Sequence, residues 1–135
     1  MPFTIKQAGA DAISFLLYDF GFTIFNDTVV VTVETLASKR KELVSFLRAS
    51  RKGWEENLAD PEAFPPTIAD TWFKGTGRSI ENEIYFNVAQ KPLIETPGGI
   101  FSMSEEAIAR NIEALAEVGI AAKRDMFDTT VVEEI

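Results

Sequence analysis

The chain has 135 residues, of which 46% are hydrophobic and 25% charged, and its net charge at pH 7 is −8. This length is typical of one domain and is sufficient to bury a core. The acidic balance argues against nucleic-acid binding, which depends on Lys and Arg neutralising phosphates. Because no run approaches the roughly 18 apolar residues of a membrane span, we expect no membrane insertion.

The sequence contains neither cysteine nor histidine. The missing thiols exclude disulfides, thiolate nucleophiles and Cys-based metal sites. The missing imidazoles remove the commonest general base and the commonest metal ligand. An oxygen-only Ca²⁺ or Mg²⁺ site stays open, but no D-x-D-x-D-G loop is present. We therefore expect a protein that is not an enzyme, with no catalytic residues, no cofactor and no metal.

Two apolar segments in the first third of the chain favour buried strands. The run ISFLLY occupies residues 13–18, and the DFG turn at residues 19–21 ends it. The run TVVVTV occupies residues 28–33, and its β-branched side chains suit a pleated surface. We predict strands near residues 12–18 and 28–34.

A long amphipathic helix follows the second run. Thr35 and Ser38 are both acceptable N-caps, and Asp60-Pro61 ends the helix. One face carries residues at steps of three and four, namely Leu43, Leu47, Ser50, Trp54 and Leu58. A strand feeding into such a helix is an α/β building block.

The second half of the chain reads as shorter helices. Pro65-Pro66 interrupts the chain, and a helix capped by Ser79 places Ile80, Ile84 and Val88 on one side before it stops at Lys91-Pro92. The sequence SMSE at residues 102–105 is a capping-box match. Gly119 is placed as the C′ residue of the helix that follows, with Ile120 contacting Leu115.

The amino-acid sequence of the first half of the chain resembles that of a known family. The pieces are the DFG turn at 19–21, the valine run at 29–33, the segment FLRASRKGW at 46–54 and the Asp-Pro pair at 60–61. In this order they resemble the second half of the SsuA/THI5-like (NMT1-type) substrate-binding proteins of ABC importers. The resemblance is good over residues 13–64 and weaker through residues 108–130. It covers most of this chain, but only the later half of a usual family member.

The resemblance implies an α/β, helix-rich fold. It corresponds to the C-terminal portion of a type II periplasmic-binding-protein fold, with the two strands named above and four to five helices. We expect residues 1–135 to form a single, partial domain of this kind.

The resemblance also implies a ligand site. In the family, the two strands run beside the cleft between two lobes, so the residues expected to approach the ligand are Tyr18, Asp19, Phe25, Asn26 and Asp27. By residue type alone, the polar members are more often plain turn residues, and aromatic side chains more often fill a core. Both interpretations are open at this point.

The family implies a non-catalytic function. Its members bind small anionic or pyrimidine-type solutes, such as nitrate, sulfonates, taurine and thiamin precursors, in the periplasm or elsewhere outside the cytoplasm, and deliver them to an ABC permease. The first fifteen residues lack the pattern of a signal peptide, so we expect none in this chain. Because half a cleft cannot enclose a solute, we expect the chain alone to bind one weakly or not at all.

Unpaired strand edges invite association, so we expect a homo-oligomer, with residues 28–33 either paired across subunits or swapped between them. Two other functions stay open. One is a small helical protein-interaction domain with its own core. The other is a THI5-type pyrimidine synthase, which depends on a histidine and a cysteine-rich iron motif that this sequence lacks.

Overall fold

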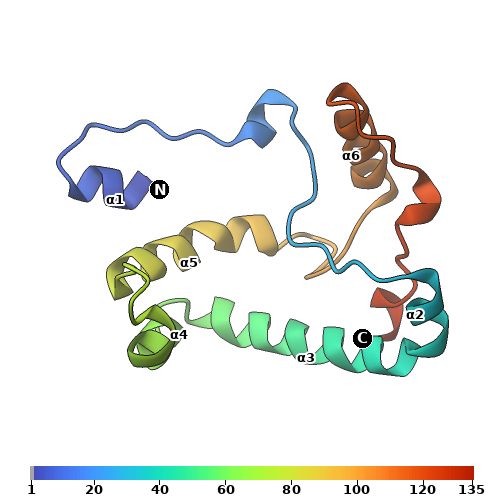
Figure 1. Cartoon of the computed structure of the whole chain (residues 1–135), viewed down its shortest axis with the longest axis horizontal. Coiled ribbons are helices and arrows are strands. Elements are labelled where there is room, and N and C mark those ends of the chain that lie inside the picture. The colour runs from blue at the N-terminus through green and yellow to red at the C-terminus, as the bar shows by residue number, and fades with distance from the viewer. Residues whose placement is uncertain (1) are drawn as a thin grey trace. The chain divides into compact units, whose positions relative to one another are not determined.

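The computed structural model describes residues 2–135, and its regular structure over that range is entirely helical (Figure 1). The helices are α1 Pro2–Gln7, α2 Val33–Ser38, α3 Arg40–Ala59, α4 Phe64–Ile68, α5 Ile80–Ile94 and α6 Glu105–Glu117. Short 3₁₀ turns cover Leu17–Phe20, Arg124–Met126 and Val132–Glu134, and a π-helical turn covers Ala69–Phe73.

The chain divides into two compact units. Unit 1 holds the N-terminal segment up to residue 14 together with residues 51–100, and unit 2 holds residues 15–50 and 101–135. Helix α3 contributes to both units, because the division falls between its residues 50 and 51. That the whole chain acts as a single domain stays a prediction.

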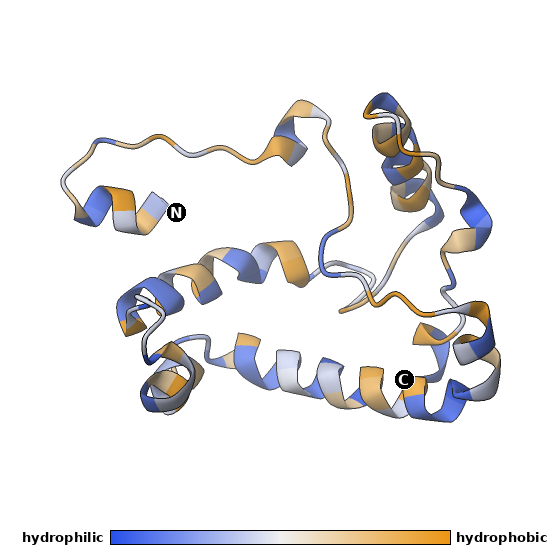
Figure 2. Ribbon diagram, in the orientation of Figure 1, coloured by the Kyte–Doolittle hydropathy of each residue, from blue (hydrophilic) through white to orange (hydrophobic). Residues whose placement is uncertain are grey.

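Both predicted strands are wrong. Residues 12–16 and 28–32 have no regular structure; the 3₁₀ turn follows the first segment and α2 follows the second. The side chains of Ile13, Val30 and Val33 are 92%, 86% and 84% exposed. A strand is stable only when its backbone groups pair with a neighbouring strand, and residues 2–135 contain none. Figure 2 shows the segment before α2 as an apolar stretch outside any helix. The α/β class is therefore replaced by a helical one over the described residues.

Helices α2 and α3 follow from local sequence signals. The side chain of Thr32 accepts a 3.1 Å hydrogen bond from the Thr35 N–H, so the helical region begins earlier than Thr35 or Ser38. Helix α3 ends at Ala59, directly before the predicted Asp60-Pro61 break. Its predicted apolar face is confirmed, since every member is buried or half-buried: Leu43, Leu47, Ser50, Trp54 and Leu58.

Unit 1 is held by polar contacts as well as apolar ones. Leu58 is 1% exposed, and the rings of Phe3 and Tyr85 bring α1 onto α5 with their centroids 5.1 Å apart. The buried residues of α5 are Asn82 and Asn87, whereas Ile80 and Val88 of the predicted apolar face are exposed. Ile84, the third residue of that face, is half-buried, so the apolar periodicity of α5 identified its buried face only in part.

Unit 2 has an apolar core on the first half of α3. Val44, Leu47 and Val131 are buried, and partly buried neighbours complete the cluster, namely Leu36, Leu43, Phe101 and Ile135. The C-terminal segment is also held by charge, because Arg40 Nε donates to Glu134 Oε1 at 2.7 Å. Residues 130–135 are therefore part of this core and not a loose tail.

Helix α6 has the boundaries that the sequence predicts at its C-terminal end. Gly119 has a φ of 80°, and the Ile120 N–H donates to the Leu115 carbonyl at 2.9 Å. At the other end Ser104 is the cap, accepting a 3.1 Å hydrogen bond from the Ala107 N–H. The cap thus lies two residues beyond Ser102, the first residue of the predicted capping box.

Candidate functional site

A hollow in unit 2 lies between the first 3₁₀ turn and α6. It has a volume of about 330 Å³. The lining comes from two separate stretches of sequence: Tyr18, Gly21 and Thr23 on one side, and Arg110, Glu113, Ala114 and Glu117 of α6 on the other. The lining therefore combines an aromatic ring, a hydroxyl and three charged side chains around small residues.

Hydrogen bonds fix the chain after Gly21 onto α6. Thr23 Oγ1 donates to the carbonyl oxygen of Arg110 at 3.2 Å. The backbone N–H of Phe25 donates to Oδ1 of Asn111 at 2.6 Å, and Asn111 is 2% exposed. The ring of Phe25 also meets that of Phe127 edge-on, with centroids 6.1 Å apart. These contacts hold one wall of the hollow against the other.

The predicted ligand residues divide into two groups. Tyr18 lines the hollow, and Phe25 anchors its wall. Asp19, Asn26 and Asp27 are exposed and do not line it. Asn26 Nδ2 lies 3.3 Å from Asp27 Oδ2, and Asp27 has a φ of 53°, so this pair forms a turn. That the five residues bind a ligand stays a prediction.

Sequence reasoning missed the α6 side of the hollow. Arg110, Glu113 and Glu117 follow one another at steps of three and four, so they share a face of the helix, with Ala114 beside them. The sequence did contain the pattern that could have indicated this side, namely charged residues at helical spacing beside the small residue Ala114. The sequence alone could not assign these residues to a site, because only the fold places Tyr18 on the other side of the hollow.

Charged contacts near the start of α6 stabilise the neighbouring loop. Arg124 donates to both carboxylate oxygens of Glu105, at 2.8 Å and 2.5 Å. These hydrogen bonds lower the pKa of Glu105 and raise that of Arg124. The contact attaches the Arg124–Met126 turn to α6 at the end opposite Glu117.

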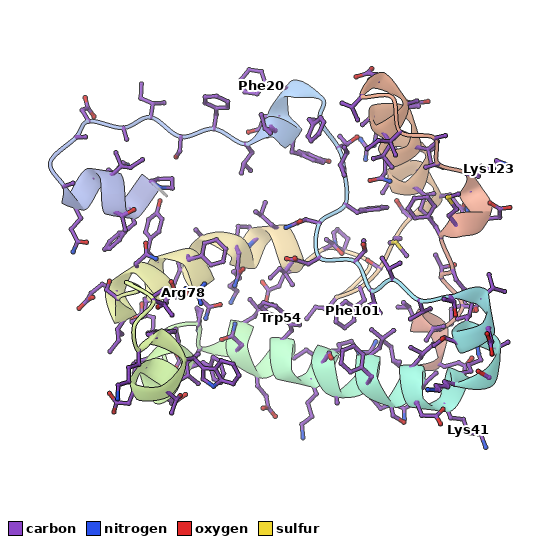
Figure 3. The ribbon with its side chains drawn as sticks, in the orientation of Figure 1. Phe20, Lys41, Trp54, Arg78, Phe101 and Lys123 are labelled. Atoms are coloured by element: carbon purple, nitrogen blue, oxygen red, sulfur yellow. The ribbon has the colours of Figure 1, made fainter. Side chains whose placement is uncertain are left out.

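A second hollow lies within unit 1, beside the π-helical turn. Its volume is about 560 Å³, and its lining comprises Ala69, Asp70, Phe73, Lys74, Arg78 and Ile80. Arg78, labelled in Figure 3, has Nε 3.4 Å from Oε1 of Glu83. The lining holds one carboxylate, Asp70, and two cations, Lys74 and Arg78, of which Arg78 already has Glu83 as an acidic partner.

Two further findings concern residues 2–135 alone. Within them, His, Cys, Asp and Glu side chains form no group of three or more that could hold a metal ion. None of the helices in that range combines the length and the apolar character needed to cross a membrane.

One family model matches the first part of the chain. Residues 2–64 match the family NMT1/THI5 like. The resemblance expected from the sequence is thereby confirmed over this segment. The match includes the Tyr18 side of the hollow, and α6 lies outside it. No curated protein and no solved structure matches the chain.

Proposed function

We propose that the chain is part of a non-catalytic solute-binding protein of an ABC importer. The observation that carries the proposal is the NMT1/THI5-like match, since the matched segment includes the residues that form one wall of the unit 2 hollow. The solute is of the nitrate, sulfonate, taurine or thiamin-precursor class. The place of action is periplasmic or otherwise extracytoplasmic, and the partner of the full-length protein is an ABC permease.

The absence of histidine and cysteine supports a role in binding. A sequence without His or Cys has no imidazole base, no thiolate and no ligand for an iron centre of the pyrimidine-synthase kind. Binding needs only shape and a few polar groups, which a hollow lined by Tyr18 and α6 supplies.

The exposed apolar run at residues 28–33 supports association into a homo-oligomer. Val29 and Val31 are also substantially exposed, so the run presents both its alternate faces to solvent. An extended segment of this composition gains most by pairing with a second copy of itself.

A small helical protein-interaction domain is the second candidate. It is favoured by the helical structure and by the buried cluster that unit 2 forms by itself. Reversible two-state unfolding of a monomer would support it.

Calorimetric titration of the purified chain with taurine, nitrate and hydroxymethylpyrimidine tests the leading proposal. We expect weak or no binding, because the resemblance covers only the later half of a usual family member, and half a cleft cannot close around a solute. Tight 1:1 binding by a monomer would contradict the partial-site proposal, and metal-dependent turnover of a pyrimidine precursor would contradict the non-catalytic one.

A further inference from the structure

Residues 23–27 contain three of the five predicted ligand residues, namely Phe25, Asn26 and Asp27. The segment follows the first 3₁₀ turn and lies outside any helix. Among residues 2–135, no backbone-to-backbone hydrogen bond involves it. A segment without such bonds keeps one conformation only if side chains hold its backbone. The side-chain contacts of this segment therefore decide where its polar groups lie.

Asn111 of α6 supplies the one acceptor that the described residues offer to a backbone N–H of this segment. Its Oδ1 accepts from the Phe25 N–H at 2.6 Å, and Asn111 is 2% exposed, so water cannot readily replace this acceptor. The Thr23 hydroxyl adds a longer bond, of 3.2 Å, to the carbonyl oxygen of Arg110. Both bonds therefore end on adjacent residues of α6.

The backbone beyond Phe25 adopts a conformation that needs such support. Asp27 has a φ of 53°, in the left-handed region that residues other than glycine adopt at a cost. Asn26 Nδ2 lies 3.3 Å from Asp27 Oδ2, and both side chains are exposed. Because the Phe25 N–H is fixed immediately before this turn, the two polar side chains extend into solvent from a defined position.

We propose that Asn111 is a positioning residue of the solute site. It holds the backbone of residues 23–27, so that Asn26 and Asp27 present their polar groups to a solute in one arrangement. This inference rests on the proposed solute-binding function, and it adds a residue that lies outside the NMT1/THI5-like match. Groups that are ordered before a solute arrives bind it more tightly, because less conformational freedom is lost on binding.

Three substitutions separate the acceptor of the Asn111 side chain from its volume. Asn111→Ala removes both, Asn111→Leu keeps a similar volume without an acceptor, and Asn111→Asp keeps an acceptor oxygen. We expect the first two to release residues 25–27 and the third to hold them. Asn87→Leu is the matched control, because it replaces a buried asparagine of unit 1 and should leave residues 25–27 ordered.

The measurement is ¹⁵N NMR relaxation on the full chain without any solute. We expect the amides of residues 25–27 to have order parameters of about 0.85 in the wild type and below about 0.6 in Asn111→Leu. The amides of Ile108 and Ala114, which are buried on α6, should keep their wild-type values. A purely structural role of Asn111 would instead lower stability throughout unit 2 and would not produce this local pattern.

Hydrogen exchange provides a test on the wild type alone. After correction for intrinsic rates, the Phe25 amide should exchange at least about tenfold more slowly than the Asn26 amide, because only the Phe25 N–H has a buried acceptor among residues 2–135. This measurement does not depend on whether the Asn111 variants fold.

Three results would overturn the inference. Unchanged order parameters at residues 25–27 in a folded Asn111→Leu variant would show that Asn111 contributes to stability alone. Release of the segment in a folded Asn111→Asp variant would show that the acceptor oxygen is not what holds it. Equal exchange of the Phe25 and Asn26 amides in the wild type would show that the bond does not fix the backbone. Since none of these measurements involves a solute, the calorimetric titration decides the proposed function separately.

Discussion

The backbone N–H of Phe25 donates a 2.6 Å hydrogen bond to the side chain of Asn111, which lies 86 residues further along the chain. Asn111 is 2% exposed. If its side chain is removed, the Phe25 N–H loses its acceptor, and water can replace that acceptor only if the surrounding structure rearranges. This bond joins the segment that matches the NMT1/THI5-like family to a helix outside the match. It is therefore a strong point at which to perturb the hollow without altering its lining.

Asn111→Ala should lower the free energy of unfolding by about 1–3 kcal/mol, because the Phe25 N–H loses its acceptor and a buried volume is left empty. Urea denaturation followed by circular dichroism measures the change. Asn26→Ala is the matched control, since the Asn26 side chain is exposed and its loss should change stability by less than about 0.5 kcal/mol. Equal losses in both variants would contradict the structure of this contact.

Two leucines of unit 1 provide a test of its core. Leu58 is 1% exposed and Leu93 is 57% exposed. We expect Leu58→Ala to cost about 2–5 kcal/mol of unfolding free energy and Leu93→Ala less than about 1 kcal/mol. Both values come from urea denaturation curves. A larger loss for Leu93→Ala would mean that α5 presents a different face to the core.

An amide pair, in which Asn87 is buried and Asn57 half-buried, joins the end of α3 to α5. Nδ2 of Asn57 donates to Oδ1 of Asn87 at 2.8 Å, and the reverse bond has the same length. Asn87 Nδ2 also donates to the Pro61 carbonyl at 2.6 Å. Asn87→Ala should therefore cost about 1–3 kcal/mol of unfolding free energy, since several partners lose a bond together.

A double-mutant cycle isolates this pair. Asn57→Ala, Asn87→Ala and the double variant should show a coupling free energy of about 0.5–3 kcal/mol. Additive losses would indicate that the two side chains act independently, in contradiction to the reciprocal geometry.

Low pH should destabilise unit 2 through Asp128. The Thr130 hydroxyl and N–H donate to Oδ1 of Asp128 at 2.7 Å and 2.8 Å, and this lowers the pKa of the Asp128 carboxyl. A lowered pKa in the folded state stabilises the fold above the unfolded pKa of about 3.9, and that stabilisation is lost as the pH falls through the folded pKa.

Thermal unfolding between about pH 6 and pH 2 measures this loss. The melting temperature of Asp128→Asn should fall less steeply below about pH 4 than that of the wild type. Thr130→Val keeps the carboxylate and removes the hydroxyl donor, and it should flatten the same region of the curve. Parallel curves for all three proteins would contradict the proposed cause.

Sequence reasoning succeeded for signals that act within a few residues. Gly119 ends α6 and Leu43 to Leu58 form the inner face of α3, because capping and helical periodicity depend only on nearby residues. The strand predicted at Val29 to Val33 was wrong because strand formation depends on residues that are distant in the sequence. A β-branched run expresses a preference for a sheet, but a strand also needs a partner elsewhere in the chain.

The candidate site shows the same limit. Tyr18 was named from the family resemblance and lines the hollow, whereas Glu113 and Glu117 became relevant only when the fold brought α6 to it. Asn82 and Asn87 of α5 were also missed as buried residues, because a period of apolar side chains cannot indicate a face made of hydrogen-bonded amides.

Apart from Phe25, the aromatic and valine side chains of residues 15–33 are exposed, and the proposed self-association depends on them. Phe20 is 74% exposed and extends away from the ribbon in Figure 3, and Val30 is 86% exposed. Large exposed apolar patches are typical of surfaces that bind a partner. We propose that the partner is a second copy of the chain, paired along residues 28–33.

Light scattering coupled to size-exclusion chromatography, across micromolar concentrations, measures the mass of the assembly. The wild type should have at least twice the chain mass of 15.0 kDa, and Val30→Lys should shift it toward the monomer. A wild-type protein that stays at 15.0 kDa throughout this range would contradict the proposed pairing.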